Sequence, residues 1–135
     1  MAVPRPVEHQ MLYEHSLPAE PANVGSMRRE LDAALVPLHL SAQRRGDIGL
    51  VVSEALTNVA MHAYIGQAVG SFTLAASTAP KSLRVTITDA GRGMVARADS
   101  PGLGLGVSVM GRLADALEIS TPSAGGTEVC ARFSL

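Results

Sequence analysis

Residues 71–89, SFTLAASTAPKSLRVTITD, alternate apolar and polar side chains on either side of a short break around Pro80. Successive side chains of a strand point to opposite faces, so this period of two predicts two half-buried strands, 71–78 and 82–89. The two strands should pair as a hairpin, and Asp89 falls at the end of the second.

Two amphipathic helices are predicted upstream of this hairpin. Apolar side chains recur at steps of three and four from Pro21 until about Pro37, where proline should stop the first helix. The same spacing runs through residues 43–64 and predicts the second helix. A short strand is expected at residues 10–17, before both helices, and residues 1–9 are expected to form a loose N-terminal tail.

A glycine-rich segment, a helix and a second hairpin are predicted downstream. Residues 90–106, AGRGMVARADSPGLGLG, are too rich in glycine and charge for regular structure. Residues 117–121 and 127–135 flank PSAGG and predict a closing hairpin. The apolar positions that predict the third helix are Val109, Met110, Leu113 and Leu117. Helices segregated from hairpins predict an α/β fold, a two-layer sandwich of a mixed, mainly antiparallel sheet with helices on one face.

Composition predicts one domain, residues 10–135, because the 135-residue chain has no long linker. A net charge of −1, two Phe, two Tyr and no Trp argue against a nucleic-acid surface. The apolar runs are too short for a membrane span and no signal core is seen, so a cytoplasmic protein without membrane attachment is expected. Cys130 is the single cysteine and is expected to be a small packed strand residue.

A polar stripe runs along the second predicted helix. Residues 53–64, SEALTNVAMHAY, place Glu54, Asn58 and His62 at steps of four, about 40° apart around the helix. Taken alone, the stripe fits a solvated helix edge. It also fits phosphoryl chemistry, because a carboxylate can accept a proton from an attacking hydroxyl and an amide oxygen suits Mg²⁺.

The segment VTITDAGRGMVA, residues 85–96, begins in the second hairpin strand, and Gly91, Gly93 and Ala96 after that strand have the form GxGxxA. A dinucleotide site is excluded, because these glycines should open a helix in a βαβ unit and Pro101 breaks the chain soon afterwards. Asp89, Gly91 and Gly93 fit a plain turn. They also fit a pocket in which backbone approaches a flat ligand and the carboxylate accepts from an exocyclic amine such as that of adenine.

Three glycines, Gly102, Gly104 and Gly106, lead into the third predicted helix. Exposed amide groups at a helix start form a phosphate cradle, although glycines in a flexible loop would look the same. The segment lacks GxxxxGK[ST], so it is not a P-loop. Thr127, after two glycines, fits an ordinary hairpin residue when it is considered alone.

Taken together and in order, EALTNVAMHAY, DAGRG, GLGLG and GGTEV resemble the ATP-binding boxes of the GHKL superfamily, which includes gyrase, histidine kinases and certain chaperones. The pattern E-x-x-T-N-x-x-x-H-x-Y is similar to that of the anti-sigma-factor serine/threonine kinases within it. The resemblance covers residues 10–135 and implies a histidine kinase-like ATPase fold.

The resemblance implies ATP and Mg²⁺ as cofactors. Glu54 would be the general base, Asn58 the Mg²⁺ ligand and Asp89 the adenine anchor. The other nucleotide-binding positions that it implies are His62 at the helix end, Gly91 and Gly93 at the adenine, Gly102, Gly104 and Gly106 in the phosphate lid, and Thr127 in the adenine network. Tyr64, at the same helix end as His62, would help to hold the pocket and its structure. The lid is short, with eight residues, 94–101, between Gly93 and Gly102, which predicts slow transfer or closure by a partner.

The resemblance also implies a function as an ATP-dependent switch. The protein would sequester an RNA polymerase sigma factor and phosphorylate a serine or threonine of an anti-anti-sigma partner. It would form a homodimer, with Met27, Leu31, Leu35 and Leu38 contributing either to that interface or to the core. Two alternatives stay open: a non-catalytic ATP-binding docking module, and a detached histidine-kinase catalytic domain.

Overall fold

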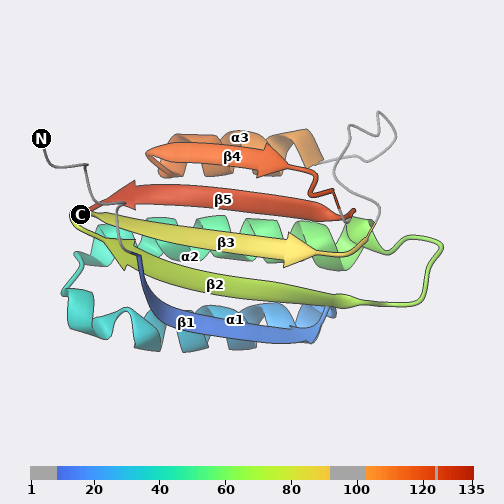
Figure 1. The fold of residues 1–135 in the computed structure, drawn as a ribbon, viewed down its shortest axis with the longest axis horizontal. Coiled ribbons are helices and arrows are strands. Elements are labelled where there is room, and N and C mark those ends of the chain that lie inside the picture. The colour runs from blue at the N-terminus through green and yellow to red at the C-terminus, as the bar shows by residue number, and fades with distance from the viewer. Residues whose placement is uncertain (1–8, 92–102, 124) are drawn as a thin grey trace, which may run out of the picture.

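The computed structural model describes residues 9–91, 103–123 and 125–135, with backbone alone at residues 103–105. Within these residues, five strands form one sheet in the order β1-β2-β3-β5-β4 (Figure 1). The strands are β1 (Gln10–Pro18), β2 (Ser71–Ala79), β3 (Ser82–Asp89), β4 (Ala116–Ser120) and β5 (Thr127–Ser134). Each pairing of neighbours in this order is antiparallel, so the described sheet is antiparallel throughout rather than mixed.

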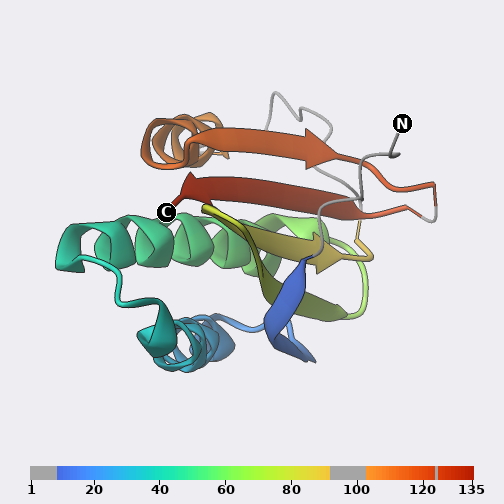
Figure 2. The same cartoon turned by 60° about the vertical axis from the view of Figure 1, so that its left-hand side comes forward.

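The helices form a second layer over one face of the sheet, as Figures 1 and 2 show. They are α1 (Pro21–Ala34), a 3₁₀ turn η1 (Val36–Leu38), α2 (Ala42–Asn58), a π-helical turn η2 (Val59–Ala63) and α3 (Leu103–Leu113). The predicted two-layer α/β sandwich is therefore confirmed. In the described part of the chain, no helix has the length and apolar character needed to cross a membrane.

Local signals set the ends of the first two helices. Pro21 begins α1, where its missing N–H costs nothing, and the 3₁₀ turn carries the chain through Pro37 after α1 has ended. His39 adopts a left-handed conformation, with φ of 52°, and closes that turn. Ser41 then caps α2, because its Oγ accepts a hydrogen bond from the Arg44 amide at 3.1 Å.

Three predicted boundaries in the helix layer are wrong. The second helix was expected to run to residue 64, but its α-helical part ends at Asn58 and a π turn follows. Gly104 and Gly106 were expected in a loop, but both lie within α3. Leu117 was expected in that helix and lies in β4 instead, because the chain turns after Leu113 and the Asp115 amide bonds to the Arg132 carbonyl at 2.9 Å.

The hydrophobic core lies between the helices and the sheet. Its largest fully buried side chains come from both layers: Met27, Leu31, Ile48, Val51, Val52, Leu56, Phe72, Leu74, Leu83, Ile87, Met110 and Phe133. Of the four residues considered for a dimer interface, Met27, Leu31 and Leu35 are buried in this core. Those three side chains therefore serve the core and are not available to a second copy.

Arg44 joins the start of α2 to the far end of the sheet. Its Nη2 donates to Asp115 Oδ2 at 3.0 Å and to the Ser134 carbonyl at 2.9 Å, and its guanidinium lies 5.8 Å from the Phe133 ring centroid. The Ser134 amide donates to the same carboxylate oxygen at 2.6 Å. These bonds, led by that from Ser134, hold the pKa of Asp115 below its ordinary value.

Candidate functional site

Three of the predicted site residues meet where α2 faces α3. A Cβ placed on Gly106 would lie 3.0 Å from Glu54 Oε2 and 3.2 Å from Asn58 Nδ2. The absence of a side chain at Gly106 therefore lets α3 approach the two polar groups of α2 closely. The structure brings the carboxylate and the carboxamide of the stripe to a single point between two helices.

Asn58 is buried, with 8% of its surface exposed, and its Nδ2 makes no hydrogen bond with any described residue. A buried N–H group without a partner costs about 1–3 kcal/mol, so such a group is expected to meet a ligand or ordered water. The solvated-edge interpretation does not hold for Asn58. Its side chain has the burial and the free donor expected of a residue that contacts a bound polar group.

The π turn η2 starts directly after Asn58 and brings its last residue against the sheet end. A Cβ on Gly91 would lie 2.3 Å from the Ala63 carbonyl oxygen, so only glycine fits there. The sequence did not predict this turn. Val59 and Ala63 are buried in it, and an ordinary α-helix would bury the same two residues. π turns inside helices are frequent at functional sites, and this one connects the helix carrying Asn58 to the segment following Asp89.

Asp89 ends β3 and pairs with Thr127 of β5, so the sheet places these two predicted residues side by side. Asp89 Oδ1 accepts a hydrogen bond from the Gly91 amide at 2.8 Å. Burial raises the pKa of Asp89, while bonds from the Gly91 and Thr127 amides partly offset that rise. Thr127 is only 2% exposed. The sheet end thus holds a half-buried carboxyl group in a fixed position.

Tyr64 ties the end of the π turn to two strand ends. Its hydroxyl donates to the Ser71 carbonyl at 2.6 Å and accepts from the Ala90 amide at 3.1 Å. Its ring occupies the space at Gly70, where a Cβ would lie 2.5 Å from it. Tyr64 therefore fixes the geometry around Asp89 through backbone contacts. His62 is half-exposed on the same turn.

Of the remaining predicted positions, one lies in a described helix and the others lie outside the described residues. Gly104 lies in the first turn of α3, two residues before Gly106. Gly93, Gly102 and the predicted lid between them lie outside the described residues. The described site consists of a helix group, Glu54, Asn58 and Gly106, and a sheet-end group, Asp89, Gly91 and Thr127, connected through η2.

The sequence model of the histidine kinase-like ATPase domain family matches residues 17–133, nearly the whole of the two-layer sandwich. The chain belongs to this family. A curated relative, blue-light-activated histidine kinase 2 of Erythrobacter litoralis, is 42% identical over 74 residues, which are 53% of this chain and 21% of the relative. This chain therefore spans about a fifth of that kinase.

A solved structure with the same fold contains the RsbU and RsbW domains of Rv1364c from Mycobacterium tuberculosis. It matches 91% of this chain and 31% of its own length, with a TM-score of 0.71 and 21% sequence identity. At that identity the likeness shows the fold. The antiparallel sheet with helices on one face is thus that of a histidine kinase-like ATPase domain.

Membership in this ATPase family implies ATP binding, and the described residues fit a nucleotide. The carboxyl group of Asp89 can accept a hydrogen bond from an exocyclic amine. The unpaired Asn58 Nδ2 can donate to a phosphate oxygen, and the Asn58 Oδ1 is a hard oxygen ligand of the type that Mg²⁺ prefers. The two groups of the site thus offer acceptors and donors of the required kinds.

Asp89→Asn should leave the ATPase domain at least as stable as the wild type near neutral pH. Because the pKa is raised above its ordinary 3.8, the stabilisation from this group is full below pH 3.8 and is lost as pH rises through the folded-state pKa. The asparagine oxygen can still accept from Gly91. The advantage of the variant should shrink on acidification toward pH 3.8, as measured by urea denaturation.

Asp115→Asn is the control of opposite sign. The pKa of Asp115 is lowered, so its stabilisation is present above pH 3.8 and is lost as pH falls through the folded-state pKa. This variant should lose stability near neutral pH. Equal losses of stability in Asp89→Asn and Asp115→Asn near neutral pH would contradict the conclusion that burial raises the pKa of Asp89.

Gly106→Ala should separate stability from ligand binding. Alanine favours the helix by up to about 1 kcal/mol, which offsets the crowding of Glu54 and Asn58, so the stability of the domain should change by no more than about 1 kcal/mol. The new methyl group would press on Glu54 and Asn58, and we expect ATP affinity to fall by up to about tenfold, or 1.4 kcal/mol. Thermal unfolding and ATP titration measure the two effects. Gly111→Ala in the same helix, where a Cβ meets only Leu117 at 4.0 Å, should leave affinity unchanged.

Proposed function

We propose that this domain is an ATP- and Mg²⁺-dependent serine/threonine protein kinase that acts as an anti-sigma factor. It binds an RNA polymerase sigma factor and phosphorylates an anti-anti-sigma partner. The observation that carries the proposal is the Glu54 carboxylate beside the buried Asn58 amide, opposite Gly106. A carboxylate placed beside an amide that can hold a cation and a phosphate is the combination that hydroxyl phosphorylation requires.

Four described residues of the site have a role in this proposal. Bound Mg·ATP supplies the phosphoryl group and a cation that neutralises its charge. Glu54 takes the proton from the attacking serine or threonine hydroxyl. Asn58 holds the cation through Oδ1 and donates from Nδ2 to a phosphate oxygen. Asp89 orients the adenine by accepting from its amine, and Gly91 keeps the backbone close enough for that contact.

The regulatory part of the proposal depends on the motif resemblance and on the fold. The pattern E-x-x-T-N-x-x-x-H-x-Y, from Glu54 to Tyr64, is similar to that of anti-sigma-factor kinases, and the solved structure with the same fold includes an RsbW domain. Phosphate on the partner adds negative charge and breaks its hold on this protein, which then sequesters the sigma factor. We place this switch in the cytoplasm and expect a homodimer.

The test is phosphate transfer from labelled Mg·ATP to small proteins in a soluble extract of the source organism. A labelled band that requires wild-type protein, and that Asp89→Asn and Glu54→Ala both abolish, supports the kinase. Its mass and sequence identify the partner. No label despite ATP binding would overturn the proposal in favour of a docking module that regulates by contact alone.

A detached histidine-kinase catalytic domain is the second candidate, favoured by the 42% identity to a histidine kinase. The stability of the label distinguishes the two functions. A phosphate ester on serine or threonine survives acid, whereas a phosphate on a histidine nitrogen is lost in acid. An acid-labile label would assign this domain to histidine phosphorylation.

A further inference from the structure

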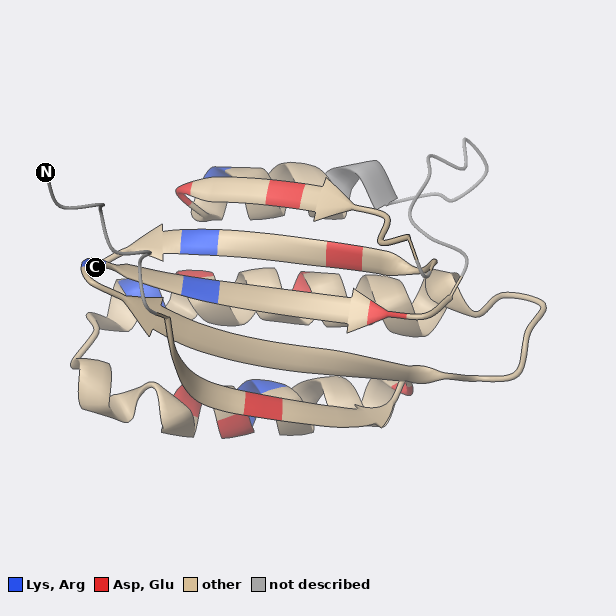
Figure 3. Ribbon diagram, viewed as in Figure 1, with Lys and Arg blue, Asp and Glu red and all other residues tan. Residues whose placement is uncertain are grey.

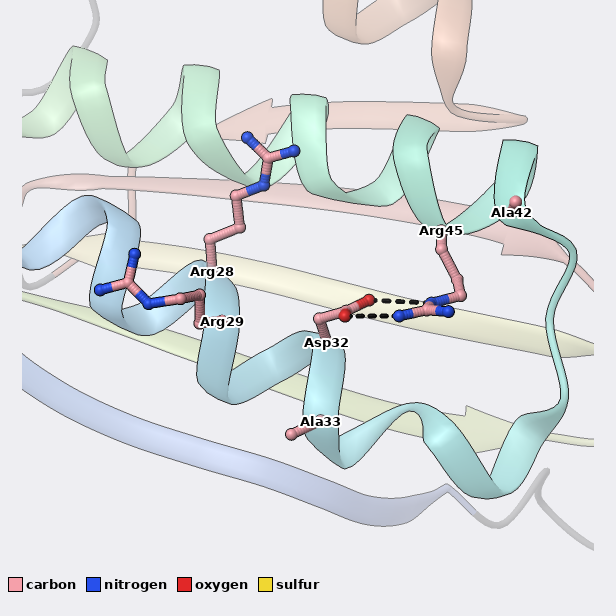
Figure 4. A pocket seen from close by; sticks show the side chains of 6 residues that line it. All are labelled: Arg28, Arg29, Asp32, Ala33, Ala42 and Arg45. Carbon is pink, nitrogen blue, oxygen red and sulfur yellow. Dashed lines mark hydrogen bonds and ion pairs between the residues drawn. The ribbon is translucent and has the colours of Figure 1, made fainter.

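A groove of about 450 Å³ runs between α1 and α2 on the outer side of the helix layer (Figure 4). Its lining residues are Arg28, Arg29, Asp32, Ala33, Ala42 and Arg45. None of them belongs to the candidate ATP site. Three arginines and one aspartate line the groove, in a chain whose net charge is −1 and whose charges of both signs are spread over the sheet and the helices (Figure 3).

One ion pair within the groove already shows how it holds a carboxylate. Arg45 Nε and Nη2 donate to the two oxygens of Asp32 at 3.0 and 2.6 Å, in the two-pronged geometry that suits a carboxylate. Arg45 lowers the pKa of Asp32, with a smaller contribution from Arg28. The charges of this pair cancel, so the positive charge that remains belongs to Arg28 and Arg29.

Two glycines leave room for these remaining guanidinium groups. A Cβ on Gly49 of α2 would lie 3.0 Å from Arg28 Nε, and a Cβ on Gly25 of α1 would lie 3.2 Å from an Arg29 Nη atom. Glycine inside a helix costs about 1 kcal/mol relative to alanine. Both arginines therefore lie against glycines, which have no side chain. Their planar guanidinium groups can thus lie close to the helix surface.

The two guanidinium groups keep most of their donors free. Arg28 donates one hydrogen bond, to Ser53 Oγ at 3.2 Å, and Arg29 makes none with a described residue. Figure 4 shows Arg28 reaching from α1 toward α2, whereas Arg29 lies along α1. Because the two groups point in different directions, two separate carboxylates of an extended segment fit them better than one compact phosphate does.

We propose that the α1–α2 groove is a docking site for an acidic segment of a partner protein, with neighbouring Asp or Glu side chains bound by Arg28 and Arg29. The small side chains of Ala33 and Ala42 leave space for the backbone of such a segment. This inference does not depend on the kinase reaction, since its test measures binding rather than phosphoryl transfer.

The test is an NMR titration of the whole chain with a hexaglutamate peptide. We expect saturable changes in the Nε–H signals of Arg28 and Arg29 and in the amides of α1 and α2, weakening as salt is added. The R28Q/R29Q variant should lose at least five-fold in affinity. The matched control is R84Q/R132Q, which removes two exposed arginines from the open face of the sheet and should bind like the wild type.

A second pair of variants tests the arrangement without changing charge. Gly49→Ala displaces the Arg28 guanidinium and should weaken peptide binding, whereas Gly46→Ala, where a Cβ meets nothing within 4 Å, should not. Equal losses of peptide affinity in R28Q/R29Q and R84Q/R132Q, or no saturable binding of the peptide, would overturn the proposal. Tighter binding of inorganic phosphate than of hexaglutamate at the same arginines would assign the groove to phosphoryl groups instead.

Discussion

Glu54→Gln is expected to lower phosphoryl transfer by about 10²–10⁴-fold, the usual contribution of a positioned general base, with little change in ATP affinity. Glutamine has nearly the same shape as glutamate but cannot take the hydroxyl proton. The contacts proposed for the Asn58 amide and for Asp89 with the nucleotide do not involve the Glu54 carboxylate. Initial rates of transfer and an ATP titration on the same preparation separate the two effects.

Glu118→Gln provides a matched control for this result, because Glu118 is an exposed carboxylate on β4 and the change in charge is identical. It should transfer phosphate at the wild-type rate. If Glu54→Gln retains transfer within a few-fold of the wild type, Glu54 is not the base, and the proposed mechanism is wrong even where ATP binding is intact.

Gly126→Ala is expected to destabilise the domain by about 2–4 kcal/mol, through backbone strain and overpacking together. Gly126 has φ of 83°, and a Cβ on it would lie 1.9 Å from the Asp89 carbonyl oxygen. Neither atom belongs to a flexible side chain, so the β3–β5 ends must separate. Because those ends carry Asp89 and Thr127, ATP affinity should fall as well.

The neighbouring glycine separates the two causes. Gly125 also has a positive φ, of 93°, but a Cβ on it meets nothing within 4 Å, so Gly125→Ala should cost only the strain of about 1–2 kcal/mol. Urea denaturation of both variants and the wild type gives the comparison. Equal losses of stability in Gly125→Ala and Gly126→Ala would show that the domain relieves the contact with the Asp89 carbonyl at no cost in free energy.

The strands and the layer arrangement could be predicted because burial on one face imposes a period that the sequence displays. Phe72, Leu74 and Ala76 alternate with polar or small residues, and all three are buried on the helix side of the sheet. The start of α3 was not predictable in this way. Gly106 looks like a loop residue by propensity, but its contact with Glu54 and Asn58 gives glycine a packing role inside a helix.

The candidate site was predicted in part, and the missing part depends on long-range geometry. The spacing of Glu54 and Asn58 placed them on one stripe, whereas the pairing of Asp89 with Thr127 depends on a strand register that local patterns do not define. The motif resemblance assigned both residues to the adenine site but did not predict that they pair. Outside the candidate site, no pattern in the sequence predicted the Arg45–Asp32 ion pair, because the two residues lie on different helices, 13 positions apart.

The π turn at Val59–Ala63 has a consequence for insertions and deletions. A turn that bonds to the fifth residue holds one residue more than an α-helical turn, so it acts as a one-residue spacer between Asn58 and Tyr64. Deleting that extra residue would leave an ordinary α-helical turn with Tyr64 still in place, whereas inserting a further residue would rotate Tyr64 by about 100° around the helix axis. The hydroxyl would then leave Ser71 and Ala90. The helix end is thus expected to tolerate the loss of one residue in this turn and not the gain of one.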